Sequence, residues 1–112
     1  MSQGEPIIAL MSDLIFFSKI AAEAKAAGQS ATMIRTVASL GGQQGKMLLV
    51  DLNMTGAIDA AAQWQQATGR PAIGFVSHVD AAAIAAAKAA GLAQVLARSR
   101  FVQVLPELVA TA

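Results

Sequence analysis

The chain has 112 residues and a formal charge of +1; 55% of its residues are hydrophobic and only 13% are charged. This length fits one compact domain, residues 1–112, and the apolar content is enough for a core. The absence of cysteine excludes disulfides and thiolate metal sites, and without a Lys/Arg cluster we expect no nucleic-acid partner.

We expect a cytoplasmic protein with no membrane contact. No uninterrupted apolar run reaches the length of a membrane span. The first residues are polar and lack the basic segment that opens a signal peptide.

Strand-like and helix-like patterns alternate along the chain. In chain order, the sequence predicts a strand at 6–11, a helix at 13–27, a strand at 30–37, a loop with at most one helical turn at 38–45, a strand at 47–51, a helix at 56–68, a strand at 71–77, a helix at 81–90, a strand at 93–97 and a short helix at 101–109. Ser12 and Asp80 are the predicted N-caps of their helices. Pro106 fits only near the start of the last helix, because an interior proline removes a hydrogen bond.

Five alternations of strand and helix indicate a single α/β domain with three layers. The first strand is almost entirely apolar, as expected for a parallel sheet that is covered on both faces by helices. The sequence therefore predicts a five-stranded parallel sheet of the flavodoxin-like class.

The segment 47–51 is an apolar strand that ends on a carboxylate, Asp51. In open parallel sheets, ligands and chemistry collect beyond the carboxyl ends of the strands. Asp51 is therefore a candidate working acid. The alternative is that Asp51 caps the turn that follows, because aspartate accepts hydrogen bonds from nearby backbone N–H groups.

This order of elements resembles the receiver domain of bacterial two-component response regulators. Asp51-Leu52-Asn53-Met54 is similar to the family's phosphoacceptor segment, and Ser77 matches its switch Ser/Thr. Lys88-Ala89-Ala90-Gly91-Leu92-Ala93 resembles the approach to the fifth strand. The resemblance places Arg98 where the family has a lysine, and Asp13 where it has one of two acids.

The resemblance also implies a site for a divalent metal ion. The family builds it from the acidic pair, the phosphoacceptor and a backbone carbonyl two residues later. In this chain those positions are Asp13, Asp51 and Asn53. The implied cofactor is therefore Mg²⁺ if the acceptor site works, and none otherwise.

Several positions depart from the family pattern. Ser12 stands where a second acid is expected, and Thr55 and Ser99 replace prolines. Arg98 differs from lysine because its planar fork suits a carboxylate better than a phosphoryl oxygen. Val95 cannot act as the family's aromatic switch. The second helix is reduced to the loop at 38–45, and the last helix is also shortened. These departures indicate a degenerate receiver, or pseudo-receiver.

Each candidate residue also has a structural interpretation. Asp51 pairs with Arg98 in this interpretation, which predicts that the two side chains touch. Asp13 is then an acid favoured by the helix dipole. Ser77 and Arg98 are the candidate anion contacts. His78 is the only histidine, and we interpret it as a loop residue.

The helix at 81–90 contains one charged residue, Lys88, and a run of alanines. A surface helix normally shows a clear polar face, so this helix is the predicted contact surface for a partner protein or a second copy. The interface residues are Ala82, Ala86, Lys88 and Ala89. Trp64 is the predicted anchor of its helix on the sheet, and one of Phe16 and Phe17 is expected to be partly exposed.

We therefore expect a non-enzymatic receiver-like module for signalling or protein interaction, acting as a homo-oligomer or through a partner. The first alternative is a working phosphoacceptor that uses Asp51 with a divalent metal. The second is a small nucleotide- or flavin-binding protein of the same architecture, although the loop after the first strand, Met11-Ser12-Asp13, contains no glycine.

Overall fold

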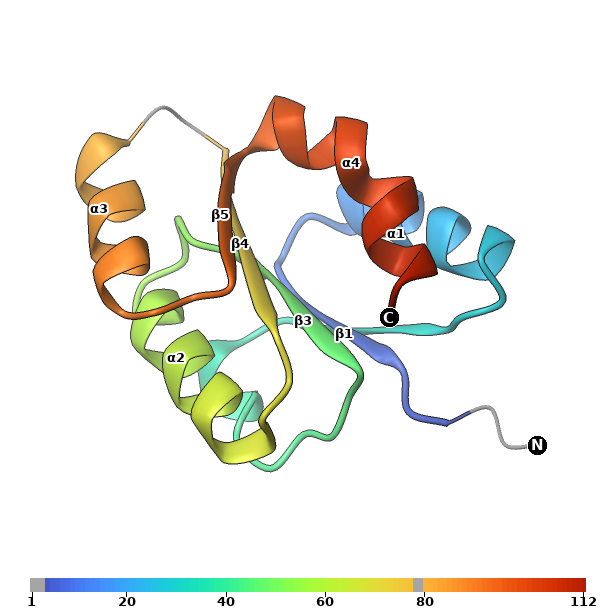
Figure 1. The fold of residues 1–112 in the computed structure, drawn as a ribbon, viewed down its shortest axis with the longest axis horizontal. Coiled ribbons are helices and arrows are strands. Elements are labelled where there is room, and N and C mark those ends of the chain that lie inside the picture. Colours follow the sequence, from blue (N-terminus) through green and yellow to red (C-terminus); the bar gives the residue numbers. More distant parts are fainter. Residues whose placement is uncertain (1–3, 78–79) are drawn as a thin grey trace.

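The computed structural model describes residues 4–77 and 80–112 (Figure 1). Five parallel strands form one sheet in the order β2-β1-β3-β4-β5. The strands are β1 (Ile7–Leu10), β2 (Ala31–Ile34), β3 (Met47–Asp51), β4 (Ala72–Val76) and β5 (Gln94–Ala97). The helices are α1 (Leu14–Ala26), α2 (Ala57–Thr68), α3 (Ala81–Ala89) and α4 (Arg98–Ala110), with a short 3-10 turn η1 (Val37–Ser39). The predicted flavodoxin-like, five-stranded parallel fold is confirmed.

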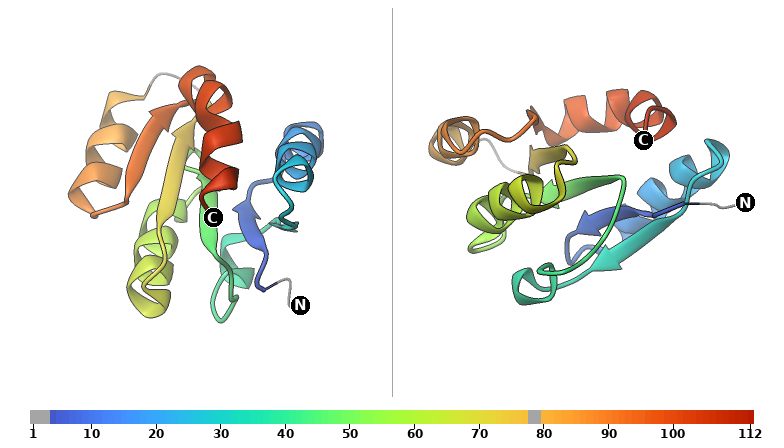
Figure 2. Two further views of the ribbon diagram at one scale, coloured as in Figure 1. Left: turned by 45° about the vertical axis from the view of Figure 1, so that its right-hand side comes forward. Right: turned by 60° about the horizontal axis from the view of Figure 1, so that its bottom comes forward.

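Helices cover both faces of the sheet, as the apolar strands require. α1 and α4 lie on one face, and α2 and α3 lie on the other (Figure 2). Alternate side chains of each central strand enter opposite clusters. In β3, for example, Leu49 packs beneath α1 and α4, whereas Leu48 packs beneath α2 and α3. No helix in the described part of the chain combines the length and the apolar character that a membrane span needs.

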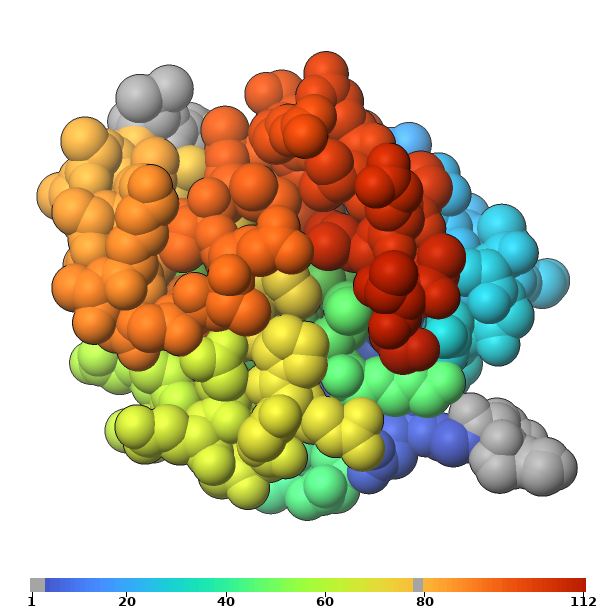
Figure 3. Space-filling view, in the orientation of Figure 1, coloured from blue at the N-terminus to red at the C-terminus, as the bar shows by residue number. Residues whose placement is uncertain are grey.

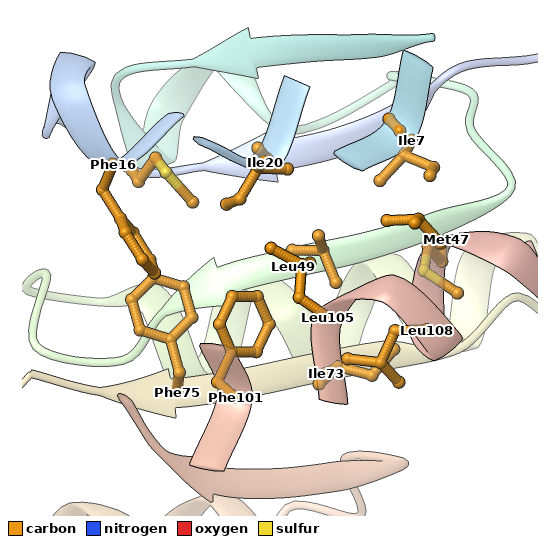
Figure 4. Close-up of a cluster of buried hydrophobic side chains, with 14 residues drawn as sticks. Ile7, Phe16, Ile20, Met47, Leu49, Ile73, Phe75, Phe101, Leu105 and Leu108 are labelled. Atoms are coloured by element: carbon orange, nitrogen blue, oxygen red, sulfur yellow. The ribbon is translucent and has the colours of Figure 1, made fainter. Parts of the chain in front are cut away.

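Three aromatic rings fill the core beneath α1 and α4 (Figure 4). Phe16 lies edge-on to Phe75, with ring centroids 5.3 Å apart. Phe75 in turn stacks on Phe101 of α4 at 4.7 Å. These contacts join β4 to both helices of this face, close to the carboxyl ends of the strands.

The last helix is longer than the sequence predicted. α4 begins directly after β5, has 13 residues and contains Pro106 in its interior, so the predicted bounds of 101–109, with Pro106 near the helix start, were wrong. A stripe of buried residues holds it on the sheet: Phe101, Leu105, Leu108 and Val109. Pro106 is exposed, so the hydrogen bond that it removes is lost on the side away from the core.

The second connection holds no α-helix, as the sequence predicted. Between β2 and β3 the chain forms only η1 and a loop. Trp64 of α2 anchors this loop, because its Nε1 donates a hydrogen bond to the Gln43 carbonyl at 2.9 Å. The indole itself is 4% exposed in the core of that face, which confirms the predicted role of Trp64.

Candidate functional site

The carboxyl ends of the parallel strands meet at one edge of the sheet. Asp51, the last residue of β3, pairs with Phe75 of β4, and Val76 of β4 pairs with Ala97 of β5. The residues of the predicted site lie at or just beyond these strand ends: Asp13, Asp51, Asn53, Ser77 and Arg98. The residues that the sequence singled out therefore lie at one edge of the sheet, and the contacts between them determine what the edge can do.

Asp51 ends β3 and caps the turn that follows. Its carboxylate oxygen Oδ1 accepts a hydrogen bond from the backbone N–H of Asn53 at 2.9 Å. This is the capping role that short polar side chains adopt at turns. Within residues 4–77 and 80–112, the Asp51 carboxylate makes no other hydrogen bond and no ion pair. The half-buried side chain therefore keeps its second oxygen, Oδ2, unengaged.

Asn53 connects the loop after β3 to the end of β4. Its side-chain oxygen Oδ1 accepts a hydrogen bond from the backbone N–H of Ser77 at 2.6 Å. The resemblance pointed to the backbone carbonyl of Asn53 as a metal ligand and missed this use of the side chain. The preference of asparagine side chains for hydrogen bonds to backbone groups in loops could have pointed to this role.

Both carboxylate oxygens of Asp13 make contacts within the protein. Oδ1 accepts a hydrogen bond from the backbone N–H of Phe16 at 2.9 Å, so Asp13, and not the predicted Ser12, caps α1. Oδ2 forms an ion pair with the guanidinium of Arg98 at 3.5 Å. The Arg98 guanidinium also lies over the Phe16 ring. The first turn of α1 is thus joined to the start of α4.

The expected pair between Asp51 and Arg98 was wrong. Among the described residues, the only carboxylate that Arg98 pairs with is that of Asp13. Arg98 opens α4, which packs beside α1 on the same face of the sheet, so the acid at the start of α1 is the partner within reach.

The donor set at this edge is a poor fit for Mg²⁺. The described part of the chain holds no group of three or more His, Cys, Asp or Glu residues that could bind a metal ion. Mg²⁺ requires hard oxygen ligands in near-octahedral geometry. Asp13 already satisfies a helix terminus and a guanidinium, which leaves Asp51 as the one carboxylate with an unengaged oxygen among the predicted ligands.

Ser77 follows β4 and is half-buried. The backbone of Ser77 is fixed by Asn53, whereas its hydroxyl makes no hydrogen bond within the described ranges. His78, which the sequence analysis assigned to a loop, lies outside the described residues.

α3 presents its alanines to the surface. Only Ala87 of this helix is fully buried. The four predicted interface residues are all exposed: Ala82, Ala86, Lys88 and Ala89. In Figure 3, α3 (light orange) forms one margin of the molecular surface.

A second apolar surface, at the start of α1, was missed by the sequence analysis. Leu14 and Ile15 are 59% and 86% exposed. Phe16 is buried, whereas Phe17 is half-buried against the core beneath α1 and α4. Phe17 is therefore the residue of the pair that is partly exposed. The signal was the buried stripe of α1, which runs from Phe16 with a spacing of four residues and excludes the two positions before it.

Comparisons with known proteins identify the fold. No protein-family profile and no curated protein sequence matches the chain. An orphan response regulator of H. pylori, HP1043, superposes with a TM-score of 0.79 at 9% identity, covering 99% of this chain and 95% of that one. The BeF3-activated receiver domain of DrrB superposes with a TM-score of 0.80 at 10% identity, covering 96% and 95%. A response regulator from Burkholderia pseudomallei, which carries a phosphorylated aspartic acid and a calcium ion, superposes with a TM-score of 0.73 at 12% identity, covering 96% and 69%. The sheet order, the full-length superpositions and the aspartate at the end of β3 together show that this chain has the fold of a response-regulator receiver domain.

Proposed function

We propose that this chain is a receiver-like signalling module that acts through protein contacts and whose phosphorylation site is degenerate. The observation that carries the proposal is the commitment of Asp13. One oxygen of Asp13 caps the start of α1, and the other pairs with the Arg98 guanidinium. The carboxylate that would help to bind a metal ion therefore already has a positively charged partner. The role is binding and signalling rather than catalysis, in the cytoplasm.

Phosphoryl transfer to Asp51 tests this proposal directly. The protein is incubated with acetyl phosphate and Mg²⁺, and its intact mass is measured beside an Asp51→Ala variant and a receiver domain that accepts phosphate. We expect an adduct on the reference receiver only. An adduct on the wild-type chain that disappears in Asp51→Ala would overturn the proposal.

The second candidate function is a working phosphoacceptor, and the unengaged oxygen of Asp51 favours it. Oδ2 has no partner in the described part of the site, so it remains available as a nucleophile. Oδ2 of Asp51 would attack the phosphorus of acetyl phosphate and form an acyl phosphate, while the bond from phosphorus to the acetate oxygen breaks and acetate leaves. Asp13 and Asn53 would complete the metal site after Arg98 has moved. The mass measurement above decides between the two candidates.

For the contact surface, we propose self-association through α3. Ala82, Ala86 and Ala89 are exposed and lie on one side of the helix, because they are spaced by four and three residues. Small side chains allow a second helix to approach closely. We expect a dimer in light scattering that Ala86→Glu dissociates. Ala22→Glu, at an exposed alanine of α1, is the matched control and leaves the dimer intact. A wild-type chain that is monomeric at all concentrations contradicts self-association.

A further inference from the structure

A groove of about 500 Å³ lies between α2 and the segment that joins β2 to β3. One wall follows the whole length of α2 and includes Asp59, Gln63 and Trp64. The opposite wall is the loop around η1, including Val37 and Leu40. The groove is separate from the site at the carboxyl ends of the strands, because it contains neither Asp13 nor Asp51.

The groove exists because one connection in this fold lacks a helix. The other connections between consecutive strands carry α1, α2 and α3, which have nine residues or more. The connection from β2 to β3 carries only η1, which has three residues, and a loop that contains Gly41 and Gly42. No α-helix packs against the side of α2 that faces this connection, and the groove lies there instead.

The lining of the groove is mixed and carries a single charge, with Gln43, Gln44 and Thr68 among its polar residues. Val37 supplies apolar surface, whereas Leu40 and Trp64 are only 2% and 4% exposed. Asp59 is the one charged residue that lines the groove, and it makes no ion pair in the part of the chain that the structure describes. Gln63, one turn further along α2, is exposed and offers an amide. The volume of the groove falls within the range of about 300–1,000 Å³ that is typical of small-molecule sites.

We propose that this groove binds a small organic cation with an apolar body. The ammonium group of the ligand pairs with the Asp59 carboxylate, and its hydrocarbon part lies along Val37. The absence of Lys and Arg from the lining disfavours an anion, which would meet only the Asp59 charge. Charge complementarity therefore selects the class of ligand.

The only tryptophan of the chain, Trp64, lies in the groove and reports on its occupation. Phenylbutylamine and its neutral counterpart phenylbutanol are titrated into the full chain, and the single indole N–H signal is followed by NMR. We expect a saturable shift with the amine at millimolar concentration, and about two- to fivefold weaker binding of the alcohol, which is the effect of one exposed ion pair.

Two variants test the role of the charge. Asp59→Asn should weaken the amine about two- to fivefold and leave the alcohol unchanged. Glu107→Gln, at an exposed acid of α4 on the opposite face of the sheet, should change neither. The amide spectrum of each variant verifies folding. Equal affinity for the amine and the alcohol, an unchanged Asp59→Asn variant, or no saturable shift would each overturn the proposal.

Discussion

The guanidinium carbon of Arg98 lies 3.9 Å from the centre of the Phe16 ring. This stacking gives a physical reason for arginine at a position where the family resemblance leads one to expect lysine. A planar guanidinium can lie flat on an aromatic ring and still pair with a carboxylate, whereas an ammonium is a compact, strongly hydrated charge. Phe16 is itself held by Phe75 and Phe101, so Arg98 rests on a fixed surface.

Removing the Arg98 side chain should destabilise the fold modestly. Arg98→Ala loses the ring contact and the ion pair with Asp13, and the side chain is 38% exposed, so solvent screens both. We expect a loss of about 1 kcal/mol in the free energy of unfolding, measured with urea. Arg98→Lys should recover less than half of this loss, because it restores the charge without the planar stack. A full recovery would show that charge alone matters.

Two substitutions at Asp13 separate its two roles. Asp13→Asn keeps an oxygen that can cap α1 and removes only the ion pair, so we expect a loss of about 0.2–1 kcal/mol that shrinks at high salt. Asp13→Ala also removes the cap, which adds about 1 kcal/mol. Urea unfolding at low and high salt measures both losses. Equal losses for the two variants would contradict the capping role.

Gly74 of β4 makes room for Leu52. A Cβ atom added at Gly74 would lie 2.6–2.8 Å from three atoms of the Leu52 side chain, which is 4% exposed and cannot leave the core freely. We expect Gly74→Ala to cost about 1–3 kcal/mol in thermal or urea unfolding. The cost should fall in a Leu52→Ala background, because the obstructing side chain is gone. An unchanged cost in that background would point to a backbone effect instead.

Asn53 should control the order of the edge formed by the ends of β3 and β4. Asn53→Ala removes the acceptor of the Ser77 N–H, so that amide should exchange its hydrogen faster and the free energy of unfolding should fall by about 0.5–1.5 kcal/mol. Asn53→Asp keeps an oxygen in the same place and should preserve the protection of Ser77. Hydrogen exchange followed by NMR measures both. Equal exchange in all three proteins would refute the link between the two loops.

Local patterns in the sequence were enough to predict most of the elements. The strand at Met47–Asp51 agrees with the predicted range because its apolar run ends abruptly on a charged residue. Asp80 caps α3 as predicted, since the cap depends only on a side chain and an N–H three residues later. The alternation of these elements also determined the parallel sheet with helices on both faces.

Only the tertiary structure decided which charges meet and where the chain leaves space. Arg98 pairs with Asp13 rather than Asp51, because α4 packs beside α1 on one face of the sheet. The same packing holds Pro106 inside α4, against local preference, because a long apolar stripe outweighs one lost hydrogen bond. The groove beside α2 likewise depends on how two distant segments pack. Contacts between residues far apart in sequence leave no periodic pattern in the sequence. These contacts determine what the strand-end edge and the groove can bind.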